Sequence, residues 1–80
     1  MNVVHKVIRE RLKLLPKTDA WNILENVLPP NERDAIYYAD VLRENLCYIG
    51  DMRMNCSESA VKKYRRDGYG KLAVAFYSKN

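Results

Sequence analysis

The chain is 80 residues long, which is enough for one domain with a single hydrophobic core and too short for two. A hydrophobic content of 48% excludes an intrinsically disordered chain, and with only three glycines and few Val, Ile and Thr alternations a sheet is not expected. The formal net charge of +4 is unevenly spread: residues 53–80 hold seven Lys and Arg against two acids, whereas residues 18–52 are acidic. A basic C-terminal third is typical of a surface that binds a polyanion, and solvated helix faces are the structural alternative. We therefore expect one all-α domain over residues 1–80.

Composition also excludes several classes of site. Two cysteines, Cys47 and Cys56, and one histidine, His5, are too few ligands for a structural zinc site, so no metal is expected. We interpret both cysteines as small buried apolar residues of a reduced, cytoplasmic protein. No signal peptide is evident, and no apolar run approaches the roughly 20 residues that span a bilayer, so a soluble protein without membrane contact is expected. No nucleophile stands beside a base, and neither an enzyme nor a cofactor is predicted.

Two helices are predicted in the first 30 residues. Residues 2–15 form the first, with Asn2 as a candidate cap and an apolar stripe made of Val4, Val7, Ile8, Leu12 and Leu15. Pro16 ends this helix, because the residue before a proline is pushed out of the α region. The second helix begins at Thr18 or Asp19, is stopped by prolines 29–30, and has an apolar face made of Ala20, Trp21, Leu24, Val27 and Leu28.

A third and a fourth helix are predicted between residues 31 and 54. Asn31 begins the third, whose inward residues are Ala35, Ile36, Ala39 and Leu42, with Tyr37, Tyr38 and Val41 widening the apolar surface. Asn45 ends that run and caps a short helix, whose inward residues are Leu46, Ile49 and one of Met52 and Met54. Residues 53–56 make a turn, in which Asn55 is suited to a left-handed conformation.

The last helix begins at Ser57, whose hydroxyl can cap a free amide of the first turn. Its predicted buried stripe is Val61, Tyr64, Gly68, Leu72 and Ala75. A different face carries Glu58, Lys62, Arg65 and Tyr69, with Ser59, Lys63 and Arg66 beside it. Either Gly68 lets another helix approach closely and this helix continues, or it breaks and restarts at Lys71; we favour a continuous helix. Small polar and basic side chains at the front of a half-buried helix favour entry into a DNA major groove.

A motif runs through these elements. Its matching pieces are Leu28-Pro29, Glu32-Arg33, Ile36, Ile49, Ser57, Val61, Lys62, Arg65 and Lys71-Leu72. Over residues 28–77 the chain resembles the fourth region of bacterial sigma factors, and its closing stretch is similar to small phage late-transcription regulators of the ArpU type. The resemblance implies a helix-turn-helix within a bundle of about five helices, in a small transcriptional regulator of phage or mobile-element origin.

The chain departs from the family pattern at the turn. The position that usually holds Ala before the turn is Gly50 or Asp51, depending on the alignment. Matching Ile49 and Gly50 to the family's Ile-Ala pair makes the turn one residue longer. Matching backwards from Val61 places Asn55 on the usual turn glycine and Asp51 on the usual alanine. The polymerase-clamping region of a complete sigma factor is also missing, so an ordinary free-standing sigma factor is excluded.

The expected function is sequence-specific binding of double-stranded DNA. Base edges would be read by Glu58, Ser59, Lys62 and Lys63, and phosphates would be bound by Arg65, Arg66 and Lys71. The candidate DNA-binding residues are therefore Ser57, Glu58, Ser59, Lys62, Lys63, Arg65, Arg66 and Lys71.

Other partners remain open at this point. A helical interaction module would use the acidic middle or the tyrosines to dock on a host protein such as RNA polymerase, and an RNA binder would stack bases on Tyr64 and Tyr69. The motif usually binds DNA as a dimer, and the N-terminal amphipathic helix is a candidate for the contact within a homodimer. Trp21 belongs either to the core or to such an interface.

Overall fold

The structure is a computed structural model that describes residues 3–77. Over that range it consists of five helices with no strand, which confirms the all-α prediction. In chain order the elements are α1 (Val3–Leu14), α2 (Lys17–Val27), α3 (Pro30–Ile36) with a π-helical continuation η1 (Tyr37–Val41), α4 (Leu46–Tyr48) with a π-helical continuation η2 (Ile49–Met54), and α5 (Glu58–Tyr77). The cap proposed at Asn2 lies outside the described residues.

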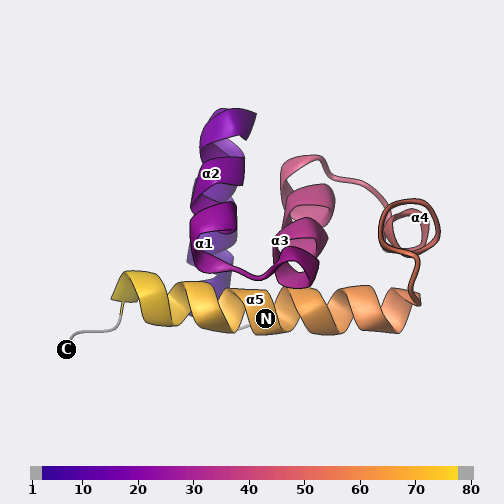
Figure 1. Cartoon of the computed structure of the whole chain (residues 1–80). Coiled ribbons are helices and arrows are strands. Elements are labelled where there is room, and N and C mark those ends of the chain that lie inside the picture. The colour runs from indigo at the N-terminus through magenta and orange to yellow at the C-terminus, as the bar shows by residue number, and fades with distance from the viewer. Residues whose placement is uncertain (1–2, 78–80) are drawn as a thin grey trace.

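The long helix α5 is the base on which the other helices are assembled. Figure 1 shows α1, α2 and α3 standing on one side of α5, roughly across its axis, while α4 lies beside the end at which α5 begins. The opposite side of α5 carries no other element in this view. We refer to residues 58–66 as the front half of α5 and to residues 67–77 as its rear half.

Two hydrophobic clusters hold this arrangement. The larger one joins α1, α2 and α3 to the rear half and consists of Ile8, Leu12, Ala20, Leu24, Leu28, Ile36, Tyr69 and Leu72. The smaller one joins α3 and η2 to the front half and consists of Ala35, Ile49 and Val61, with Met54, Cys56 and Tyr64 among the half-buried residues around it. Burial of apolar area is the main favourable term in folding. The two clusters therefore fix α5 at both ends, the rear half against α1, α2 and α3 and the front half against α3 and η2.

Proline sets the first helix boundaries. Helix α1 ends at Leu14, before Pro16, as predicted. Helix α2 begins at Lys17 directly after Pro16, so the prediction that Thr18 or Asp19 caps it is wrong. The preceding residue Pro16 stands at the cap position itself, and the two polar residues lie inside the first turn. Helix α3 likewise begins at Pro30, because proline suits the first helical position, where its missing amide is not needed.

The buried stripe of α5 differs from the predicted one. Val61, Gly68 and Leu72 are buried, but Tyr64 is half-buried and Ala75 is exposed, so Ala75 was assigned wrongly. Tyr69, which was placed on the polar face, is fully buried. The inward line runs through residues 61, 65, 68, 69 and 72, which follows helical spacing but includes polar side chains that hold partners on other helices.

Helix α5 is continuous through both glycines, as favoured from the sequence. A Cβ atom added at Gly68 would lie 2.7 Å from Ile36 Cδ1 and 3.3 Å from Glu32 Cβ. The absence of a side chain at Gly68 therefore lets α3 approach α5 closely.

The cysteine assignment is half wrong. Cys56 is half-buried against the smaller cluster, but Cys47 is exposed, and both are free thiols. Of the two methionines left open, Met54 faces inward and Met52 is exposed.

Candidate nucleic-acid interface

The segment before α5 is fixed by an asparagine at each end. Asn45 caps α4, since its Oδ1 accepts hydrogen bonds from the Cys47 amide at 2.8 Å and the Tyr48 amide at 3.3 Å. Asn55 ends η2 in the left-handed conformation, with φ 53° and ψ 51°. Both roles were predicted from the sequence.

The turn before α5 is formed by the end of η2 together with Asn55 and Cys56. Gly50 is buried against the turn, where an added Cβ would lie 2.5 Å from the Cys56 carbonyl oxygen. The Cys56 amide donates to the Gly50 carbonyl at 2.9 Å and closes the turn around Asn55. Because η2 is π-helical, it accommodates an additional residue between Gly50 and Asn55. Gly50 therefore occupies the close approach while Asn55 keeps the left-handed position.

Helix α5 begins with the predicted side-chain cap. Ser57 Oγ accepts a hydrogen bond from the Ala60 amide at 3.1 Å. Glu58 follows at the positive end of the helix dipole, and its carboxylate lies 3.5 Å from Lys62 Nζ. Ser57, Glu58 and Ser59 are exposed, so the first turn is accessible from the side opposite to α3.

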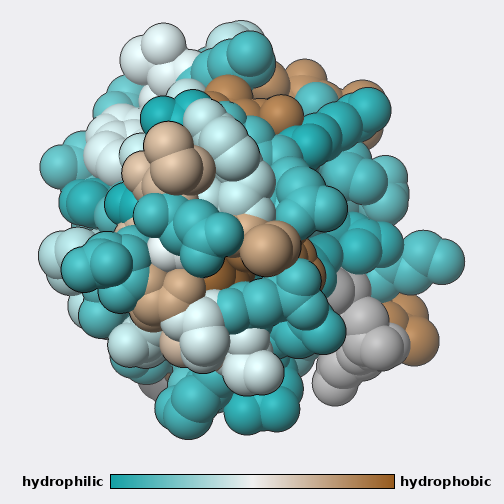
Figure 2. Space-filling model, turned by 90° about the vertical axis from the view of Figure 1, so that its right-hand side faces the viewer, coloured by the Kyte–Doolittle hydropathy of each residue, from teal (hydrophilic) through white to brown (hydrophobic). Residues whose placement is uncertain are grey.

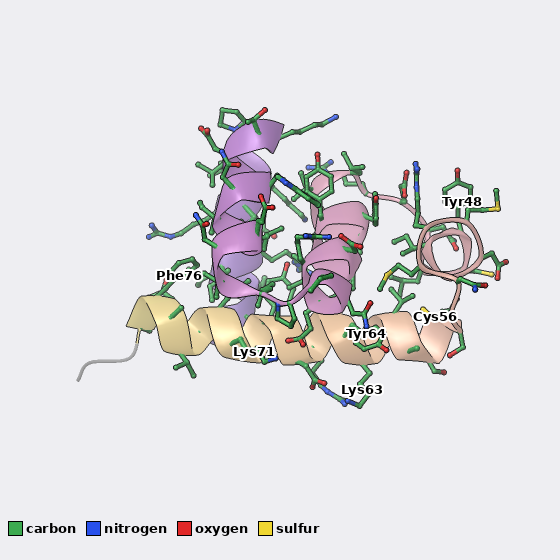
Figure 3. The ribbon with its side chains drawn as sticks, in the orientation of Figure 1. Tyr48, Cys56, Lys63, Tyr64, Lys71 and Phe76 are labelled. Carbon is green, nitrogen blue, oxygen red and sulfur yellow. The ribbon has the colours of Figure 1, made fainter. Side chains whose placement is uncertain are left out.

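A row of cations follows on the exposed side of the front half. The side chains of Lys62, Lys63 and Arg66 are 60%, 65% and 72% exposed. Lys63 projects away from the rest of the molecule, whereas Tyr64 points towards α3, as Figure 3 shows. Lys63 Nζ lies 2.9 Å from Asp67 Oδ2, and this contact raises the pKa of Lys63 and lowers that of Asp67. The contact therefore favours the charged form of Lys63.

Arg65 has a different position from the other cations of the last helix. Its Nε and Nη2 donate to the two carboxylate oxygens of Asp40 at 2.9 and 2.7 Å, in a bidentate pair. The hydrogen bond to Asp40 raises the pKa of Arg65, and its side chain is only 22% exposed. Arg65 was grouped with the phosphate-binding residues on the basis of the sequence, but its fork is occupied inside the protein.

Asp40 also accepts a hydrogen bond from the Tyr69 hydroxyl, so one buried carboxylate in η1 holds two side chains of α5. Burial, and then the charge of Asp40, raise the pKa of Tyr69 well above its usual range. The His5 ring stacks on Tyr69 with 5.9 Å between ring centroids. This cluster was missed because its members come from three elements that are distant in the sequence.

Lys71 is intermediate between the exposed row of cations and the half-buried Arg65. Its Nζ donates to Glu32 Oε2 at 2.9 Å, yet half of its side chain remains exposed at 53%. The pair joins α3 to the rear half of α5. Of the eight residues predicted to bind DNA, seven are exposed along α5 and Arg65 is not.

The surface around this helix is hydrophilic. Figure 2, which looks onto the end at which α5 begins, shows a mainly hydrophilic face with hydrophobic side chains in separate patches. Another arginine, Arg53, lies on this side of the fold and donates to Glu44 at 3.1 and 2.7 Å, with its guanidinium over Tyr38 and Tyr48. This contact ties η2 to the loop that precedes α4.

An apolar groove opens at the other end of the molecule. It has a volume of about 600 Å³ and is lined by Ile8, Arg11, Leu12, Leu14, Leu15, Ile23, Phe76 and Tyr77. Leu14 is 85% exposed, and half of Phe76 is exposed beside it. Phe76 and Lys63 belong to opposite ends of α5 (Figure 3), so the groove and the row of cations are separate surfaces.

Two further features bear on the possible chemistry. Within residues 3–77 no three His, Cys, Asp or Glu side chains are grouped as metal ligands. None of the described helices is both long enough and apolar enough to cross a membrane.

The chain matches no protein-family model, and the searches of curated proteins and of solved structures also gave no match.

Proposed function

We propose that the chain binds double-stranded DNA through the exposed side of α5, with α4, η2 and α5 acting as a helix-turn-helix. The observation that carries this proposal is the row of Lys62, Lys63 and Arg66 on a helix whose inner side is buried against α3 and η2. A helix held in this way can enter the major groove, which is wide enough for one. Its cations can neutralise phosphates and release counterions.

The residues divide into two groups by their reach. Glu58, Ser59, Lys62 and Lys63 lie at the start of α5 and would face base edges, where Lys donates to guanine and Glu accepts from cytosine. Arg66 and Lys71 lie further along and would bind phosphates. Ser57 contributes through the amide end of the helix that it caps. Arg65 orients the helix through Asp40 and leaves the set of DNA contacts.

The ion pairs along α5 do not oppose this function. Lys62 with Glu58 and Lys63 with Asp67 are exposed pairs, which contribute little to stability because solvent screens them. Such pairs can be exchanged for contacts with phosphates or bases at little cost.

The biological role follows from the resemblance of residues 28–77 to sigma factors and to ArpU-type regulators. We propose a small, non-catalytic transcriptional regulator of phage or mobile-element origin that acts in the cytoplasm. The bidentate Asp40–Arg65 contact and the capped turn support a rigidly held recognition helix, which sequence reading requires.

The test is fluorescence anisotropy with a random 25-mer duplex across a salt series. For the wild type we expect log affinity to fall against log salt with a slope of about −3, at ~0.9 per phosphate neutralised. A Lys62/Lys63/Arg66→Ala variant should lose most of this slope. The charge-matched control Lys6/Lys13/Lys17→Ala, on α1 and α2, should keep it. Absence of wild-type binding at low salt, or equal losses in both variants, would refute the proposed interface.

A second candidate function is protein association through the apolar groove, because exposed hydrophobic patches of this kind mark interaction sites. We propose a second copy of the chain as the occupant. Arg11 lines the groove on α1. Asp19 lies one turn from Ile23 on α2. A twofold axis that brings Arg11 of each copy to Asp19 of the other would pair opposite charges.

Light scattering after gel filtration tests this association. We expect a dimer for the wild type and a monomer for a Leu14/Phe76→Ser variant, in which two exposed apolar side chains become polar. A monomeric wild type would refute the dimer. If that monomer also failed to bind duplex DNA, binding of purified bacterial RNA polymerase would be measured next, because docking on polymerase is the interaction-module alternative.

A further inference from the structure

Gly70 has no packing role in the free protein. It lies inside α5, where glycine is among the least favourable residues because it gives up the most backbone freedom. Apart from its chain neighbours and the adjacent backbone of α5, no atom lies within 4 Å of the position that its Cβ would occupy. Gly68, two residues earlier, is closed off by Ile36 and Glu32. Of the two glycines in α5, Gly68 is therefore explained by contacts within the chain and Gly70 is not.

The space above Gly70 is a shallow groove along the flank of α5 next to the end of α2. Its volume is about 620 Å³, and it is lined by Val27, Arg66, Asp67, Gly70, Lys71, Val74 and Ala75. Apart from Val27, all of these residues belong to α5. Because Gly70 has no side chain, an elongated partner can reach the helix backbone at this point.

Two cations border this groove. Arg66 lies one helical turn before Gly70, and Lys71 follows it directly, so both reach the groove from the same helix. Two acids lie nearby: Asp67 is 2.9 Å from Lys63, and Glu32 is 2.9 Å from Lys71, so Lys71 exchanges its contact with Glu32 for one with phosphate when DNA binds. The Nε of Arg66 comes no closer than 3.9 Å to Asp67, so its fork is free to take a phosphate.

We propose that the sugar-phosphate backbone of DNA lies against α5 at Gly70, between Arg66 and Lys71. This inference rests on the proposed function and adds a backbone contact at Gly70, one helical turn beyond Arg66, to the DNA interface. Arg66 and Lys71 hold one phosphate group or two adjacent ones, while Val27 and Val74 contact the apolar edge of the sugars. Gly70 is required because a side chain there would hold the backbone away from the helix.

Charge favours DNA over a second copy of the chain in this groove. If α5 of another protomer crossed at Gly70, Arg66 and Lys71 of one protomer would face Arg66 and Lys71 of the other. These like charges would repel each other. A phosphate backbone is complementary to both cations.

The test uses Gly70→Ala and Gly70→Gln in the full chain, measured by thermal unfolding and by anisotropy with a random 25-mer duplex. Since the position is open, Gly70→Ala should raise Tm by about 4 °C through helix propensity. Its DNA affinity should nevertheless fall about threefold, and that of Gly70→Gln about tenfold. The control Asn22→Gln, on the exposed side of α2, should bind as the wild type does.

Four outcomes overturn the inference. Unchanged DNA affinity in Gly70→Gln, with salt-sensitive binding by the wild type, refutes the contact at Gly70 and leaves the proposed function standing. A lowered Tm in Gly70→Ala refutes the open position. Loss of a dimer in Gly70→Gln, without a loss of DNA affinity, assigns the groove to a second copy. Absence of DNA binding by the wild type refutes both this inference and the proposed function.

Discussion

The two halves of α5 both bury one face in the fold, but their exposed side chains differ in chemistry. In the front half, Val61 and Arg65 face inward while Lys62, Lys63 and Arg66 are exposed. In the rear half, Gly68, Tyr69 and Leu72 face inward, and beside Lys71 the exposed side chains include the apolar Val74, Phe76 and Tyr77. A helix whose inner side is fully used in the fold can thus present two surfaces, one suited to a polyanion and one to an apolar partner.

The two halves meet at Asp40, and removing its charge should have the largest effect on stability. Asp40→Asn leaves the guanidinium of Arg65 without its buried counterion. Breaking such a pair costs about 3–5 kcal/mol, and we expect about 3 kcal/mol because Arg65 retains some contact with water. Urea unfolding measures this loss. The control Asp51→Asn, at an exposed position, should change the free energy of unfolding by about 0.5 kcal/mol or less. Equal effects of the two substitutions would show that Asp40 does not join the halves.

The packing of the rear half can be broken at Gly68. In Gly68→Ala the new methyl group would lie 2.7 Å from Cδ1 of the fully buried Ile36, so that side chain must shift within the core. Overpacking of this kind costs about 1–3 kcal/mol, and the gain in helix propensity of ~1 kcal/mol offsets part of it. We expect a net loss of about 1 kcal/mol in urea unfolding, opposite in sign to Gly70→Ala. Stabilisation by both substitutions would mean that α3 does not approach α5 closely at Gly68.

The buried phenol of the rear half should make stability fall at high pH. Burial raises the pKa of Tyr69 above its ordinary value of 10.0, so the unfolded chain loses this proton at a lower pH than the folded protein. Stability from this group is therefore complete below about pH 10 and decreases as pH rises further. Tyr69→Phe should cost about 1 kcal/mol at pH 7 through its lost hydrogen bond. It should also show a shallower decrease of unfolding free energy between pH 9 and 11.

Tyr48→Phe provides the matched control for the pH series, because Tyr48 is an exposed tyrosine on α4. We expect it to keep the wild-type pH dependence. A Tyr69→Phe variant with the same alkaline slope as wild type would show that the phenol of Tyr69 is not responsible for it.

Local signals in the sequence predicted the features that depend on neighbouring residues. The caps at Asn45 and Ser57 and the left-handed Asn55 follow from side-chain chemistry within one helical turn. The continuity of α5 through Gly68 was favoured over a break, and the close contact with Ile36 agrees with that choice.

Within α5, the structure differs from the reading of the sequence mainly where a partner is distant in the sequence. Arg65 was assigned to phosphate and Tyr69 to the polar face because their spacing does not reveal Asp40, which lies 25 and 29 residues away. The π-helical segments η1 and η2 were not expected either, since periodicity cannot distinguish one extra residue in a turn. Thus the fold class and most helices followed from pattern, whereas the division of α5 required tertiary contacts.

The most direct test of the DNA-binding face is a ¹H–¹⁵N NMR titration of the full chain with a short random duplex at low salt. We expect the largest amide shifts at residues 57–63, 66 and 70, and small shifts at Leu14 and Phe76 beside the apolar groove. Shifts confined to α1, α2 and residues 74–77, or no shifts at all, would contradict the assignment of the exposed side of α5 to DNA.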